Sequence, residues 1–398
     1  QAILLESAPP AKRGVAMAIS GMGVVVAPIV GPTLGGWMTD NYSWRWMFYI
    51  NLPVGVLAFL LCKAVIEDPP YLATARKRQG SVDYVGFGLM AVWLATLQVV
   101  LDKGQQEDWF AAPWIVWFSV LSAASMAAFV LWELKAKHPI VNLRVLKNAN
   151  LATGTVMMTL LGMVLYATIT LQPLFLQSLM GYSAMDSGLA LSPRGIGAIV
   201  AMMLVGRLIG KVDSRLLITA GFAILAGVSF HFAGINLEID KAHIAWPNVI
   251  MGLSLGVIFV PLTTTAMGGL PQDQMGNASG IFNLMRNLGG GIGISIVTTM
   301  VARGAQTHQT HLSANLAPTS PRLQEFLGGA QAYLAQFMDP VQAKQASLAL
   351  LQSLLGQQAS LLAYLDSFRL LGVVSLACLP GILILRSRKA GAGNVPLH

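Results

Sequence analysis

Three arginines interrupt long apolar segments of this 398-residue sequence: Arg194, Arg286 and Arg369. A guanidinium inside an apolar helix needs hydrogen bonds, a counter-charge or water, because an isolated buried charge is costly. Arg286 shares a helical face with Asn283 and Asn287, at spacings of three and one turn or less. This arrangement favours a polar cavity lining around Arg286. For Arg194, snorkelling to an interface is the alternative.

The carboxylates are placed differently from the arginines. All 17 acidic residues fall in loops or near helix ends, and Glu133, Asp186 and Asp366 come nearest to an apolar interior. Proton-coupled chemistry usually needs a carboxyl in mid-membrane, because desolvation moves the pKa of such a group toward neutrality. The sequence offers none. Asp366 precedes Arg369 by three residues, which predicts a local structural ion pair.

A set of polar side chains within apolar segments is predicted to line a pathway: Tyr166, Gln172, Arg194, Asn283, Arg286 and Asn287. Each of them is equally suited to an inter-helix hydrogen bond, and this alternative stays open.

Other candidate chemistry is weak. His308 and His311 have a metal-compatible spacing but no third ligand nearby, so they are interpreted as solvated loop histidines and no metal site is expected. The glycine-rich run 289–293 lies inside an apolar segment, whereas a nucleotide loop follows a strand. Cys62 and Cys378 are interpreted as small buried residues. We therefore predict no catalytic residues, no cofactor and no enzyme activity.

Composition indicates the elements that position these residues. The chain is 55% hydrophobic and 11% charged, against about 25% charged for a soluble domain. We predict an all-α polytopic membrane protein. The net charge of +8 is scattered over short loops, which argues against nucleic-acid binding. Ten apolar runs have membrane-spanning length: about 14–38, 45–66, 83–101, 112–133, 151–179, 187–208, 215–235, 247–268, 278–302 and 361–385.

The basic residues predict the orientation. With these spans, 16 of the 25 lysines and arginines fall on one side, six on the other and three within spans. The richer side is expected to be cytoplasmic. The long loop 303–360 is then outside, and helical spacing over 323–337 and 348–355 predicts two amphipathic helices too short to span. They form either a cap on the bundle or a docking surface for a partner protein.

Several motifs carry a family resemblance. The segment Gly31-Pro32-Thr33-Leu34-Gly35-Gly36 resembles the antiporter motif in the fifth helix of facilitator exporters, with Ala27 where that motif usually has glycine. Segments 44–55, 191–197, 261–265 and 283–293 resemble the EmrB/QacA-type branch, the 14-helix drug:proton antiporters of the major facilitator superfamily.

The resemblance implies a domain organisation. Residues 1–66 would be the rest of an N-terminal six-helix lobe, from the end of helix 4 through helices 5 and 6. Residues 67–147 would be a two-helix insert, and 148–398 the C-terminal six-helix lobe with the loop 303–360. Ten of an expected fourteen helices would then be present, and the coupling carboxylate would lie in the other four.

A cytoplasmic gating loop is also implied, as a degenerate copy of the family motif that contains Gly206, Arg207, Asp213 and Arg215. Asp213 is expected to make exchangeable salt bridges or helix-terminus contacts there, unless the segment is an ordinary positive-inside turn.

The function implied is proton-driven efflux of amphipathic or hydrophobic drug-like compounds across the inner membrane by alternating access. The partners implied are protons, the lipid bilayer, a periplasmic membrane-fusion adaptor and an outer-membrane channel. The alternatives are a facilitator-type importer of a small polar metabolite and a non-transporting sensor or scaffold.

Overall fold

The computed structural model describes residues 23, 31, 33–65, 83–137, 139–209, 211–317 and 319–385. Every regular element in these ranges is a helix, as the composition predicts. Nine helical segments of the described chain are long and apolar enough to cross a membrane. They correspond to the last nine predicted spans. The predicted span 14–38 lies mostly outside the described residues, although 33–41 is helical.

The helices that follow along the chain are α3 (Trp46–Tyr49), α4 (Asn51–Val65), α6 (Tyr84–Lys103), η2 (Trp109–Ala111), α7 (Pro113–Lys135), η3 (Leu143–Lys147), α8 (Ala149–Ser178), α9 (Ala184–Leu191), α10 (Pro193–Leu208), α11 (Ser214–Phe232), α12 (Lys241–Met267), α13 (Gln272–Ala314), α14 (Pro321–Leu334), α15 (Pro340–Ala377) and α16 (Leu379–Ile384).

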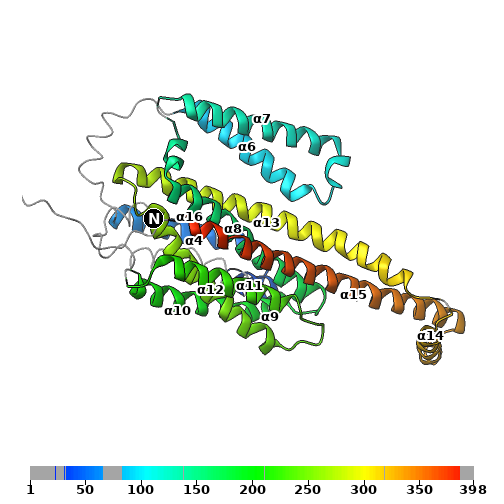
Figure 1. The fold of residues 1–398 in the computed structure, drawn as a ribbon. Helices are drawn as coiled ribbons and strands as arrows, with labels where there is room; N and C mark the ends of the chain where they lie inside the picture. The colour runs from blue at the N-terminus through cyan, green and yellow to red at the C-terminus, as the bar shows by residue number, and fades with distance from the viewer. Residues whose placement is uncertain are drawn as a thin grey trace, which may run out of the picture.

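Helices α8 to α13, α15 and α16 form the main bundle, in which α8 packs on α13, and α12 packs on α10 and α11 (Figure 1). Helices α6 and α7 pack mainly on each other and lie along the side of the bundle near α13. The proposed division at residues 66 and 147 stays a prediction.

Glycines allow the bundle helices to approach closely. A methyl group added at Gly162 of α8 would overlap the Arg286 carbonyl of α13, and one at Gly252 of α12 would overlap the Arg194 carbonyl of α10. Close backbone contact through small residues is how membrane helices pack, because lipid offers no hydrophobic driving force between them. The glycine-rich run 289–293 lies within α13 and serves this packing: Gly289 faces the main chain of α8.

The predicted span 187–208 is two helices. The first, α9, ends at Leu191, and α10 begins with Pro193 at its first position. Proline has no N–H and favours the first turn of a helix, so it starts α10 after Ser192. This break places Arg194 in the first turn of α10.

The predicted boundaries at 302 and 361 are wrong. Helix α13 continues to Ala314 and α15 already begins at Pro340, so both project beyond the bundle, with α14 at their tip (Figure 1). The 43 residues of α13 measure about 65 Å at about 1.5 Å per residue, twice the thickness of a bilayer core. The first predicted amphipathic helix is α14, but 348–355 belong to α15 and form no separate helix.

Candidate functional site

The antiporter-motif segment contacts helix α9 through its helix at 33–41. Thr33 Oγ1 donates a hydrogen bond to the Gly188 carbonyl at 2.7 Å. At the other end of the contact, the Met185 N–H donates to Asp40 Oδ2 at 2.9 Å. The two bonds join segments more than 140 residues apart in the sequence and fix the motif helix across α9.

The glycines of the motif have different surroundings. A Cβ added to Gly36 would lie 2.5 Å from the Ala184 carbonyl oxygen, so only glycine permits this approach. At Gly35 the added atom would lie 3.2 Å from Met47 Sδ, and at Gly31 it would meet nothing within 4 Å. Pro32 lies outside the described residues. Gly36 is therefore the motif glycine that sets the contact with α9.

Arg194 is the most deeply buried charged side chain of the bundle, with 2% of its surface exposed. Its Nη2 donates to Gln172 Oε1 of α8 at 2.6 Å and to Asn248 Oδ1 of α12 at 2.9 Å. Nε donates to the same Asn248 oxygen at 3.1 Å, and Nη1 donates to Thr168 Oγ1 at 3.2 Å. All of these partners are neutral. The guanidinium joins α8, α10 and α12 and does not reach toward an interface.

Arg286 has a contrasting environment in α13. Its Nε and Nη1 are shielded from solvent and have no hydrogen-bond partner among the described residues. One residue further on, Asn287 is exposed, and its Oδ1 lies 3.5 Å from the Tyr166 hydroxyl of α8. Asn283 donates to the Ser279 carbonyl one turn earlier. The structure thus brings Tyr166 and Asn287 together beside Arg286, and places Gln172 and Arg194 in a separate buried cluster.

The predicted gating loop runs from the end of α10 to α11. Asp213 precedes α11, and its Oδ1 accepts the Arg215 N–H at 2.9 Å, which is a helix-terminus contact. Within the described residues Asp213 forms no salt bridge. Gly206 lies in the last turn of α10 beside the exposed Arg207, and Arg215 Nε is buried without a partner among the residues described.

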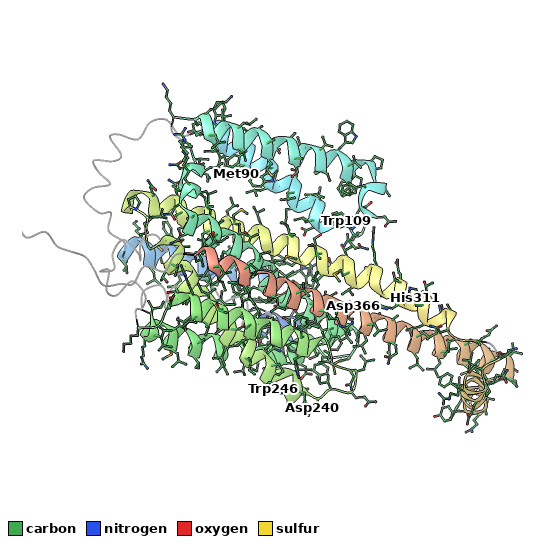
Figure 2. All side chains as sticks on the ribbon, in the orientation of Figure 1. Met90, Trp109, Asp240, Trp246, His311 and Asp366 are labelled. Atoms are coloured by element: carbon green, nitrogen blue, oxygen red, sulfur yellow. The ribbon has the colours of Figure 1, made fainter. Side chains whose placement is uncertain are left out.

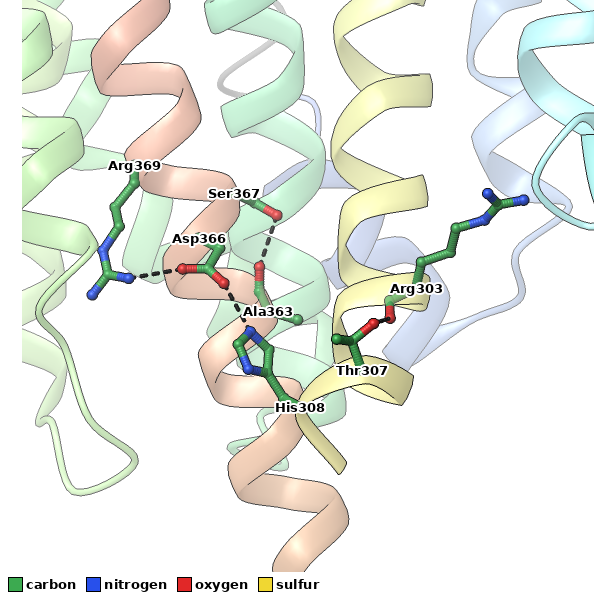
Figure 3. Close-up of polar contacts among 7 residues, drawn as sticks. All are labelled: Arg303, Thr307, His308, Ala363, Asp366, Ser367 and Arg369. Carbon is green, nitrogen blue, oxygen red and sulfur yellow. Dashed lines mark hydrogen bonds and ion pairs between the residues drawn. The ribbon is translucent and has the colours of Figure 1, made fainter. Parts of the chain in front are cut away.

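A three-residue ion-pair cluster joins α13 to α15 where they leave the bundle (Figure 3). Arg369 Nη1 lies 2.8 Å from Asp366 Oδ1, which confirms the predicted local pair. The other oxygen of Asp366 lies 2.8 Å from His308 Nε2. The interpretation of His308 as a solvated loop residue is wrong, because the helix continues through it and α15 packs against it.

A cavity of about 650 Å³ opens at the turn between α11 and α12, lined by Phe230, His231, Gly234, Ile235, Asn236, Glu238, Ile239, Asp240 and His243. Figure 2 shows Asp240 and Trp246 at this end of the bundle. The backbone N–H and then the imidazole of His243 hold the pKa of Asp240 below its ordinary value. None of the predicted pathway residues lines this cavity.

Sequence reasoning missed three residues of these clusters. Asn248 and Thr168 are polar residues in apolar spans, and that signal was available. Glu133 was placed at a helix end, where water was expected to surround it, but its side chain is 1% exposed. The expectation that every acid is solvated is therefore wrong for Glu133.

The family model described as Major Facilitator Superfamily matches residues 1–294, which is most of the chain. The chain belongs to the Major Facilitator Superfamily. It is 37% identical over 325 residues to the fatty acid resistance protein FarB of Neisseria gonorrhoeae, covering 82% of this chain and 63% of FarB. It is also 37% identical over 326 residues to the multidrug export protein EmrB of Escherichia coli K12, covering 81% of this chain and 63% of EmrB.

One solved structure is that of a bacterial homologue of the human lysosomal transporter Spinster, inward-facing and unoccupied. It matches with a TM-score of 0.45 and 12% identity, over 98% of this chain and 75% of that one.

The chain spans less than two thirds of the length of FarB and EmrB. The family and its EmrB-type branch, inferred from the motifs, are confirmed by the family match and these relatives, and so is the multi-pass membrane character.

Proposed function

We propose that this protein exports amphipathic or hydrophobic drug-like compounds across the inner membrane, driven by proton influx. The printed names of FarB and EmrB, fatty acid resistance and multidrug export, support an export role for a relative. The observation that carries the proposal is the contact of the motif helix 33–41 with α9. It joins the proposed N-terminal lobe to the C-terminal lobe through few polar bonds and a close glycine.

Such a contact suits alternating access, in which one helix bundle rocks against another around a central site. A contact between lobes must form in one state and break in the other, so it has to be close without being strongly bonded. With the orientation predicted by the basic residues, Gly36 and Ala184 lie toward the outside. The contact would then close the outer side, and its separation would open that side.

Within this scheme, Tyr166, Arg286 and Asn287 are the proposed pathway lining, and the Arg194 cluster holds the C-terminal lobe together. The unpartnered guanidinium nitrogens of Arg286 support the first assignment, because a cation without a structural partner is available to substrate or water.

Substitution of Arg286 tests the pathway. We expect Arg286→Ala to reach wild-type membrane levels and to lose most efflux of an amphipathic fluorescent dye. Arg286→Lys should recover only part, because a lysine keeps the charge and loses the planar fork of donors. Efflux by Arg286→Ala at the wild-type rate would show that Arg286 is not in the pathway.

Two assays separate the alternative functions. A facilitator-type importer would exchange a labelled polar metabolite in counterflow, which an exporter of amphipathic compounds would not. A sensor or scaffold would leave the susceptibility of a deletion strain to a compound panel unchanged, whereas loss of an exporter raises it.

A further part of the proposal concerns the projecting ends of α13 and α15 with α14. We propose that they dock a membrane-fusion adaptor, which continues to an outer-membrane channel. Aromatic and aliphatic side chains are exposed on this tip, with 63% of Tyr333, 71% of Phe337 and 67% of Val341 accessible. Exposed apolar clusters of this kind are typical of interaction sites.

Replacing residues 310–355 with a short linker should abolish crosslinking to the adaptor and leave membrane insertion intact. Phe337→Glu should weaken crosslinking, whereas Glu325→Gln, a polar change on the same helical tip, should not. Unchanged crosslinking after the replacement would refute this part of the proposal.

A further inference from the structure

Two carboxyl groups meet where α6 begins and α7 ends. Asp83 precedes the first residue of α6, and its Oδ1 accepts the Gly86 N–H at 2.8 Å. Trp132 Nε1 of α7 lies 3.0 Å from each Asp83 oxygen. Donated hydrogen bonds favour the charged form of a carboxylate. Asp83 is thus equipped as the ionised member of the pair.

Glu133, the residue after Trp132, is equipped differently. Its side chain is 1% exposed, and Oε2 accepts the Val141 N–H at 3.2 Å. Its other oxygen, Oε1, is buried and has no partner among the described residues. A buried carboxylate with an unbonded oxygen is costly, whereas a neutral carboxylic acid carries a proton it can donate.

The unbonded oxygen of Glu133 is directed at Asp83. A Cβ added to Gly86 would lie 2.6 Å from Glu133 Oε1 and 2.6 Å from Asp83 Oδ2. The two oxygens are therefore at most 2.6 + 2.6 = 5.2 Å apart, on either side of the space that Gly86 leaves free. Two carboxylates at this separation repel each other, and a shared proton removes the repulsion.

The described cations around the pair are engaged elsewhere. Arg144, from η3, donates through Nη2 to the Leu134 carbonyl at 2.8 Å. On α7 and the turn after it, Lys135 and Lys137 are exposed to solvent. On α6 the facing charged group is Asp83 itself, and on α13 the nearest partner of this turn is the neutral Asn277, which accepts the Asn142 N–H at 3.3 Å.

We propose that Glu133 and Asp83 form a proton-binding site at the base of the α6–α7 hairpin. A single proton taken from water forms the O–H bond on Glu133 Oε1, and a side-chain rotation lets this hydroxyl donate to Asp83 Oδ2. The ligand of the site is a proton, and the site does not depend on the proposed export function.

Infrared spectroscopy of the protein in lipid tests the proposal directly, because a protonated carboxyl has a carbonyl stretch distinct from that of a carboxylate. At pH 7 we expect such a band, shifted by D₂O. It should disappear in Glu133→Gln, move in Asp83→Asn and remain in Asp366→Asn, which removes an ion-paired carboxylate elsewhere.

Two results would overturn the proposal. One is identical protonated-carboxyl bands in the wild type and in Glu133→Gln. The other is a pair of carboxylate bands that respond to replacing sodium by choline, which would mean that the site holds a metal cation. Glutamine matches the shape of a neutral glutamic acid, so Glu133→Gln should keep the wild-type melting temperature, and this measurement shows whether the variant is folded.

Discussion

The hydrogen bonds of Arg194 allow a quantitative prediction about the bundle of α8, α10 and α12. Asn248 Oδ1 accepts two bonds from the guanidinium, at 3.1 and 2.9 Å. A hydrogen bond to a charged group contributes about 1.5 kcal/mol or more. Asn248→Leu removes both bonds and leaves Nε without an acceptor in a buried site. We expect it to lower the free energy of unfolding by about 3 kcal/mol, at the lower end of the cost of leaving a buried charge unpaired.

The second variant of this cycle removes the charge. Arg194→Met in the Asn248→Leu background should restore most of the lost stability, because the uncompensated guanidinium is then absent. Ser375→Ala is a matched control, since its buried hydroxyl bonds only the Leu371 carbonyl of its own helix, and it should cost less than about 1 kcal/mol.

The assay is reversible unfolding in mixed micelles with increasing SDS, followed by tryptophan fluorescence. A cost below about 1 kcal/mol for Asn248→Leu would refute the reasoning, because hydrogen bonds between membrane helices average about 0.6 kcal/mol. Failure of Arg194→Met to relieve the defect would refute it independently.

Two further predictions concern the motif helix and the start of α12. Gly36→Ala should prevent the close approach to α9 and reduce efflux several-fold, whereas Gly31→Ala, with open space around the added methyl, should export normally; equal efflux by the two variants would contradict the contact. The lowered pKa of Asp240 means that its carboxylate stabilises the folded state above the pKa of an unfolded aspartate, and that this contribution is lost as pH falls through the folded value. Protection of the His243 amide from hydrogen exchange should therefore fall on acidification in the wild type, and Asp240→Asn should remove that pH dependence; an unchanged profile would show that Asp240 does not cap α12.

The spans were predictable because runs of about 20 apolar residues are almost specific to membrane helices. Hydropathy marks where a helix leaves the apolar layer, and not where the helix ends, so α13 and α15 were predicted too short. The Asp366–Arg369 pair was predictable because it is local, three residues apart on one helix.

The clusters formed between helices were not predictable in the same way. Glu133 is buried because the chain after α7 turns back and brings the Val141 N–H to it, and local sequence carries no signal for that turn. Arg194 was recognised as an intramembrane charge, but its partner Asn248 lies 54 residues away and was found only in the folded bundle.

The central claim is proton-driven export, and the most direct test is proton movement in inverted membrane vesicles that contain the protein. With an imposed proton gradient, acid inside, addition of an amphipathic fluorescent substrate should dissipate the gradient while the substrate enters the vesicle, and vesicles with Arg286→Ala should show neither change. Substrate entry without proton efflux, or no response to the substrate in wild-type vesicles, would contradict the claim.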